Sequence, residues 1–80
     1  MDDRGIMQRI TALVEEEHRL LSQHGQGGLS EAERQRMEEL EVTLDQCWDL
    51  LRQRRARRHA GLNPNDAEVR PASVVERYQQ

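Results

Sequence analysis

Glu15 and His18 have the Glu-x-x-His spacing that di-iron sites use in helical bundles. Successive side chains are rotated by about 100° around a helix, which turns both residues away from the apolar stripe of the same segment. Metal ligands in a bundle core would have to face that stripe. We therefore expect a solvated acidic face here, with no bound metal and no cofactor.

Cys47 is the only cysteine, so the chain cannot form an internal disulfide. A reactive thiol needs a nearby base and positive surroundings, whereas the neighbours Asp45 and Asp49 are acidic. Two interpretations stay open, a small buried side chain and a reactive thiol, and the pattern favours the first.

No sequence motif of an enzyme is present. The chain has no Gly-rich phosphate loop, no Ser/His/Asp set and no paired cysteines at metal spacing. A chain of 80 residues folded as a helical hairpin also has little interior from which to build a pocket. We expect a protein that is not an enzyme.

Charge is distributed unevenly along the chain. Residues 1–51 carry twelve acidic and five basic side chains, whereas residues 52–80 carry seven basic and three acidic ones. Five arginines lie close together and form the arginine end: Arg52, Arg54, Arg55, Arg57 and Arg58. They surround the predicted helix, and either they bind an anion such as nucleic acid or they are balanced by the helix dipole and by acids of the same chain, including Asp2, Asp3, Glu68 and Glu76.

Two segments have the apolar period of an amphipathic helix. We expect helices over about residues 3–22 and about 30–59. Asp2 or Asp3 can cap the first helix, and the Ser-x-x-Glu pattern at Ser30 is a capping box that begins the second. Gly61 is expected to end the second helix.

Gly25, Gly27 and Gly28 interrupt the two helices, so these should form an antiparallel two-helix hairpin over residues 1–60. Residues 61–80 are expected to be an extended tail with one short helical turn, which Ser73 could cap and which carries Val74, Val75 and Tyr78. The tail should pack on the hairpin or on a second chain.

The fold class is therefore all-α, and such a small core should be completed by a partner. We expect two hairpins to pair into a four-helix bundle, as a homodimer. The expected core and interface residues are Ile6, Ile10, Leu13, Leu20, Leu40, Leu44, Cys47, Trp48 and Leu51.

For two residues of the apolar stripes, the sequence leaves two structural roles possible. Glu17 lies in the first apolar stripe, where it either makes a buried contact that fixes the register or leans out to solvent. Trp48 lies at the edge of the second stripe and packs either within one chain or, as the better alternative, across an interface.

The stretch LDQCWDLLRQRRARR, the tail VRPASVVERY and the opening ITALVEEEHRLL together resemble the bacterial family catalogued as domain of unknown function 2630. The resemblance extends over nearly the whole chain and is least clear in the loop SQHGQGGLSE. It implies a short intracellular bacterial protein and identifies no catalytic residue.

The pattern favours an intracellular interaction or structural protein that associates with itself or with a larger protein. The alternative is a nucleic-acid-associated protein that uses the arginine end. No apolar run approaches the roughly 18 residues that a membrane helix needs, and the single cysteine suits a reducing compartment, so we expect a cytoplasmic protein without a membrane partner.

Overall fold

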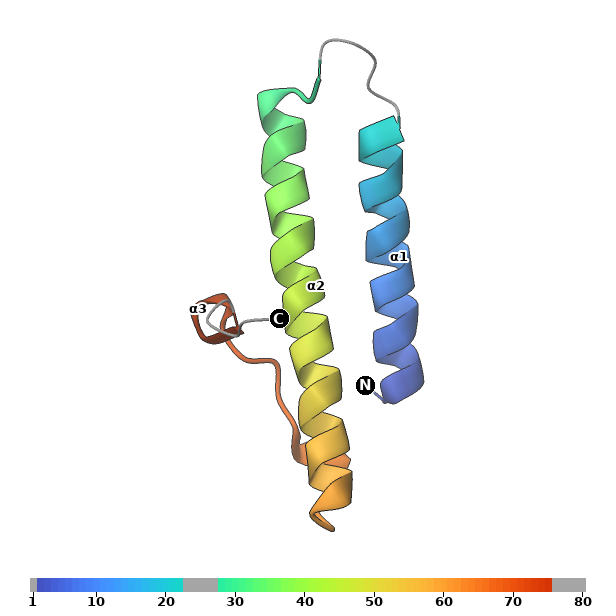
Figure 1. Ribbon diagram of the computed structural model, residues 1–80, viewed down its shortest axis with the longest axis vertical. Coiled ribbons are helices and arrows are strands. Elements are labelled where there is room, and N and C mark those ends of the chain that lie inside the picture. Colours follow the sequence, from blue (N-terminus) through green and yellow to red (C-terminus); the bar gives the residue numbers. More distant parts are fainter. Residues whose placement is uncertain (1, 23–27, 76–80) are drawn as a thin grey trace.

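The computed structural model describes residues 2–22 and 28–75. Two long helices, α1 (Asp3–Ser22) and α2 (Glu31–His59), lie side by side and run in opposite directions (Figure 1). A short 3₁₀ helix, η1 (Pro64–Asp66), and a single helical turn, α3 (Ala72–Val75), follow α2. Every regular element in the described part of the chain is helical, which confirms the all-α class.

The helix ends are formed by the capping residues that the sequence predicts. The Asp2 Oδ1 atom accepts a hydrogen bond of 2.8 Å from the Gly5 amide and so caps α1. At the start of α2, the Glu33 amide donates to Ser30 Oγ (3.2 Å), and the Ser30 amide donates to Glu33 Oε1 (2.9 Å). These reciprocal bonds satisfy two amides that lack partners within the helix, and they confirm the capping box.

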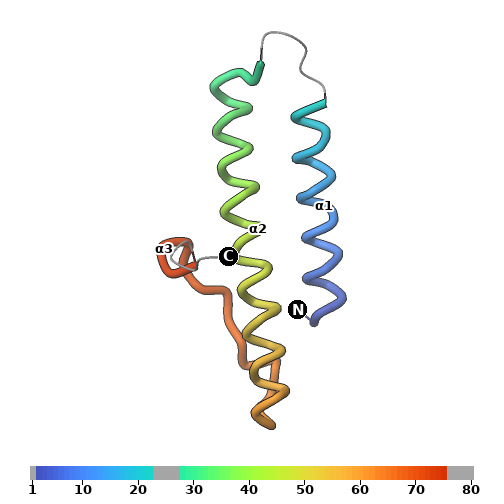
Figure 2. Tube along the Cα trace, in the orientation of Figure 1, coloured from blue at the N-terminus to red at the C-terminus, as the bar shows by residue number. Residues whose placement is uncertain are grey.

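Gly61 ends α2 as predicted. Its φ of 74° lies in the left-handed region, which a residue without a Cβ atom adopts at no steric cost. The chain reverses there, and the Leu62 amide donates to the Arg57 carbonyl at 2.8 Å. Residues 62–75 can therefore return along α2 (Figure 2).

The core lies between α1 and α2. Its apolar members share helical spacing on the facing sides of the two helices, and they are Ile6, Ile10, Leu13, Leu40, Cys47 and Leu50. The predicted residues Leu20, Leu44 and Leu51 are partly buried against this cluster. Trp48 is different, because 41% of its surface is exposed.

α3 lies on the side of α2 that faces away from α1 (Figure 1), whereas Ala67 of the preceding segment packs against the core cluster. Among the described residues, η1 and α3 contact α2 and make no helix-to-helix contact with α1. Val75 is 2% exposed and anchors α3. The predicted cap at Ser73 is wrong: the helical turn begins at Ala72, and the Pro71 carbonyl accepts from the amides of Val74 and Val75.

Several predicted features lie outside the described residues, namely Gly25, Gly27, Glu76 and Tyr78. Within the described part of the chain, neither long helix has an apolar stretch sufficient to span a membrane.

Candidate functional site

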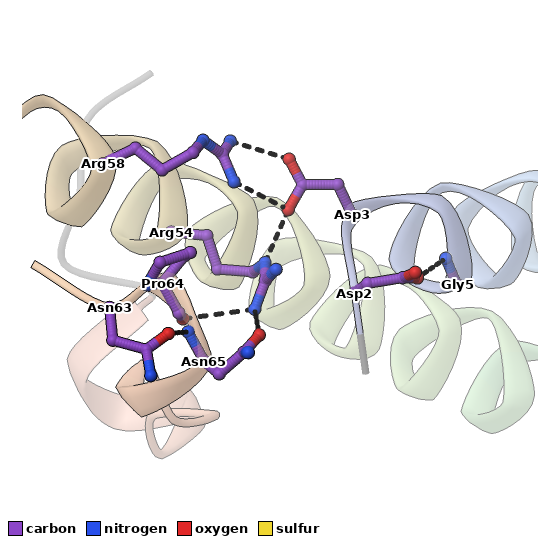
Figure 3. Close-up of polar contacts among 8 residues, drawn as sticks. All are labelled: Asp2, Asp3, Gly5, Arg54, Arg58, Asn63, Pro64 and Asn65. Carbon is purple, nitrogen blue, oxygen red and sulfur yellow. Dashed lines mark hydrogen bonds and ion pairs between the residues drawn. The ribbon is translucent and has the colours of Figure 1, made fainter.

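Asp3, the first residue of α1, binds two residues of the arginine end (Figure 3). Its Oδ1 atom accepts from Arg54 Nε at 2.5 Å and from Arg58 Nη1 at 3.2 Å. Its Oδ2 atom accepts from Arg58 Nη2 at 2.7 Å. The N-terminus of α1 is thus fixed to the last turns of α2 by charge-assisted hydrogen bonds.

Arg54 also binds the connector after α2. Its Nη1 atom donates to the Pro64 carbonyl (3.1 Å) and to Asn65 Oδ1 (3.0 Å), and the Asn65 amide donates to Asn63 Oδ1 at 2.9 Å (Figure 3). Only 6% of Arg54 is exposed, so this guanidinium joins α1, α2 and η1 from a buried position. Removing one partner of such a buried pair destabilises a fold, and a guanidinium in this position is not presented to a ligand.

The hydrogen bonds from Arg58 and then Arg54 lower the pKa of Asp3 from its ordinary value of 3.8 to about 2. The unfolded chain therefore binds this proton more readily than the folded chain does, and folding stability rises with pH in this range. We predict that the contribution of Asp3 is complete above about pH 4 and is lost as the pH falls through about 2.

NMR titration of the Asp3 carboxyl carbon should give a midpoint of about 2, and Arg58→Ala should move it toward 3.8. A midpoint near 3.8 in the folded wild-type chain would show that these ion pairs do not form in solution.

The five arginines of the arginine end have different surroundings in the structure. Arg54 and Arg58 bind Asp3, one of the acids that the sequence suggests as a charge-balancing partner. Arg52 and Arg55 are exposed, and Arg57 is half-buried. The positive charges of Arg54 and Arg58 are thus partly balanced by the Asp3 carboxylate of the same chain.

Asp49 forms a second polar cluster, which sequence reasoning missed. It is 0% exposed, although it lies on the side of α2 opposite the core. Its Oδ2 atom accepts from Arg70 Nε (2.8 Å) and from Gln53 Nε2 (2.9 Å), and its Oδ1 atom accepts from Arg70 Nη2. The hydrogen bonds from Arg70 are the main reason that the pKa of Asp49 is lowered.

Two glutamine amides add bonds from α2 to the tail backbone. Gln53 Nε2 donates to the Glu68 carbonyl at 2.7 Å, and Gln46 Nε2 donates to the Arg70 carbonyl at 3.2 Å. Together with Asp49, these residues hold the tail along α2. No spacing rule links Asp49 to a partner 21 residues further along the chain, so the sequence carried no local signal for this cluster.

The interhelix ion pair near the other end of the hairpin involves Glu16 and not Glu17. Arg36 donates to both Glu16 carboxylate oxygens, from Nε at 2.6 Å and from Nη2 at 2.9 Å, and this lowers the pKa of Glu16. Arg36 also binds Glu39. Glu17 is half-buried in α1. A bidentate pair between the helices helps to fix their register.

The remaining candidates for chemistry are placed as follows. Glu15 and His18 are both exposed on α1. No group of three His, Cys, Asp or Glu side chains that could hold a metal ion occurs within residues 2–22 and 28–75. Cys47 is buried in the core, and burial raises the pKa of its thiol, although Arg9 partly opposes the shift.

An apolar surface remains uncovered on one side of the hairpin. Trp48 and Met7, which are 41% and 44% exposed, line a groove of about 530 Å³ with Leu51. Leu44 lies one helical turn before Trp48 on the same stripe of α2. We call Met7, Leu44, Trp48 and Leu51 the Trp48 face. Arg52, Arg55 and Asp3 line the polar edge of the groove.

Comparison with known proteins identifies the family of this chain. The family described as Protein of unknown function (DUF2630) matches residues 2–80. The chain belongs to this family. Its relatives include uncharacterized proteins of Mycobacterium bovis and of Mycobacterium tuberculosis. Each is 51% identical over 77 residues, which cover 95% of this chain and 88% of the relative.

No solved structure matches this DUF2630 chain. The family assignment confirms the resemblance carried by the motifs of the first helix, the arginine end and the tail. It assigns no reaction, so the geometry of the Trp48 face and of the two polar clusters is the basis for a function.

Proposed function

We propose that this DUF2630 protein is a small helical interaction protein that associates with itself through the Trp48 face. Two hairpins would cover each other's apolar faces and form a four-helix bundle. The observation that carries the proposal is the exposed indole of Trp48, which lies beside the exposed thioether of Met7 on one side of the hairpin. The proposal assigns no catalytic reaction to the chain.

The size of the chain supports this interpretation. An 80-residue domain buries only about 60% of the surface of its unfolded chain, so its own core is marginal. The molecule measures 52 × 24 × 18 Å, and its broad side is large enough for the roughly 800 Å² per partner of an ordinary stable interface. Tryptophan and methionine are also enriched in the centres of such interfaces.

The alternative, nucleic-acid binding by the arginine end, has weaker support. Phosphate contacts need accessible cations, whereas Arg54 is buried and Arg58 shares the carboxylate of Asp3. The exposed arginines Arg52 and Arg55 instead lie at the edge of the Trp48 face, where they suit the polar rim of a protein interface.

The experiment compares two truncations of exposed apolar side chains. Trp48→Ala should weaken self-association about 30-fold or more, because a tryptophan at an interface centre typically contributes 2 kcal/mol or more. Leu62→Ala is the matched control, since Leu62 is 56% exposed and lies beyond α2, outside the Trp48 face. It should leave the dissociation constant within about twofold.

Both constants can be measured by sedimentation equilibrium, with circular dichroism to check that each variant keeps its helices. Equal dissociation constants for the wild type, Trp48→Ala and Leu62→Ala would show that the Trp48 face is not the interface.

A further inference from the structure

The exposed stripe of α2 that contains Trp48 carries opposite charges on its two halves. On the side of α2 that carries Trp48, the nearest exposed charged residues before Trp48 are the acids Glu38 and Glu41, and the nearest after it are Arg52 and Arg55. Trp48 lies between the two pairs. The surface is therefore self-complementary: rotating it by half a turn about an axis through Trp48 exchanges its acidic and basic halves.

One acidic and one basic residue of this charge pattern lie next to the Trp48 face itself. Glu41 and Arg55 each lie seven residues, or about 10 Å along the helix, from Trp48. With intervals of three and four residues, they share one stripe with Leu44, Trp48 and Leu51. Both are exposed, and neither makes an ion pair with another residue that the structure describes.

We infer that the occupant of the Trp48 face is a second copy of this chain, with the two α2 helices antiparallel and crossing at Trp48. This arrangement rests on the self-association proposed above. The twofold axis would stack the two Trp48 side chains near the centre. It would place Glu41 of each protomer opposite Arg55 of its partner, which gives two reciprocal ion pairs at the rim.

The opposite orientation is disfavoured by charge. In a parallel pair, Glu41 would face Glu41 of the second copy, and Arg55 would face Arg55 of the second copy. Like charges directly opposed across an interface reduce affinity, and complementary charges fix the orientation. The same distribution argues against an entirely acidic or entirely basic partner, because either one would be repelled by half of the stripe.

The test is a charge exchange between Glu41 and Arg55. Within one chain the two residues are about 20 Å apart, so they can influence each other only across an interface. Glu41→Arg alone and Arg55→Glu alone should each weaken the dimer about tenfold, because each turns two attractive pairs into repulsive ones. The double variant should return to within about threefold of wild type, because both pairs are then re-formed with reversed charge.

An equimolar mixture of the two single variants gives an independent readout. Each mixed dimer contains two Arg–Glu pairs, so the mixture should associate about as tightly as wild type. Glu15→Arg is the control for added positive charge, since Glu15 is exposed on the far side of α1, and it should leave the dissociation constant unchanged.

The outcomes separate this arrangement from self-association itself. A wild-type chain that stays monomeric would overturn both. A dimeric wild type whose double variant is no tighter than the single variants would overturn only the antiparallel arrangement. Single variants that bind as tightly as wild type would overturn it as well, since the two side chains would then not face each other.

Discussion

Replacing Arg70 with alanine is expected to release the tail from α2 and to cost up to about 3 kcal/mol of unfolding free energy. The wild-type guanidinium satisfies both oxygens of Asp49, which is completely buried under the tail. Without Arg70, the Asp49 carboxylate would keep the Gln53 donor alone among the residues that the structure describes. The cost is limited because Arg70 is 35% exposed and because the tail can detach and return Asp49 to water.

Asp49→Ala should cost less than Arg70→Ala, since it leaves no buried charge and Arg70 can turn to solvent. Arg34→Ala is the control, because the ion pair of Arg34 with Glu31 is exposed, and it should change stability by less than about 0.5 kcal/mol. Urea unfolding gives the free energies, and hydrogen exchange at residues 67–75 reports whether the tail is docked. Retained protection there in Arg70→Ala would contradict this account.

Leu40→Ala is expected to have the other large effect, a loss of about 3 kcal/mol within the 2–5 kcal/mol range of buried leucine truncations. Leu40 is 0% exposed and belongs to the cluster between α1 and α2. Because a domain of this size is stable by only about 4–12 kcal/mol, the variant should lose a large share of its stability.

The same substitution at Leu62, which is 56% exposed, is the matched control and should cost less than about 0.5 kcal/mol. All free energies must be compared at one protein concentration, because association with a second chain adds to apparent stability. A Leu40→Ala variant as stable as Leu62→Ala would show that the cluster is not the core in solution.

The hairpin could be predicted from the sequence because its determinants are local. Apolar residues at helical spacing give α1 and α2, the capping box at Ser30 begins α2, and Gly61 ends it with a positive φ. Each of these signals extends over only a few residues.

The tail and the arginine end could not be predicted in the same way, because their contacts join residues far apart in the chain. Asp49 meets Arg70 after 21 residues, and Asp3 meets Arg54 after 51. In the sequence, Arg54 cannot be distinguished from the other arginines of the arginine end. In the fold, it is bound to Asp3, Pro64 and Asn65. For Trp48, helical phase placed the residue at the edge of the stripe, and only the position of α1 shows that much of its indole is uncovered.

The central claim, self-association through the Trp48 face, is tested most directly by the mass of the wild-type chain at equilibrium. Sedimentation equilibrium from about 1 µM to about 100 µM covers the dissociation constants of moderate complexes. We expect the mass to rise reversibly from 9.4 kDa toward twice that value. A mass that stays at 9.4 kDa over the whole range, in a chain that still unfolds cooperatively, would contradict the claim.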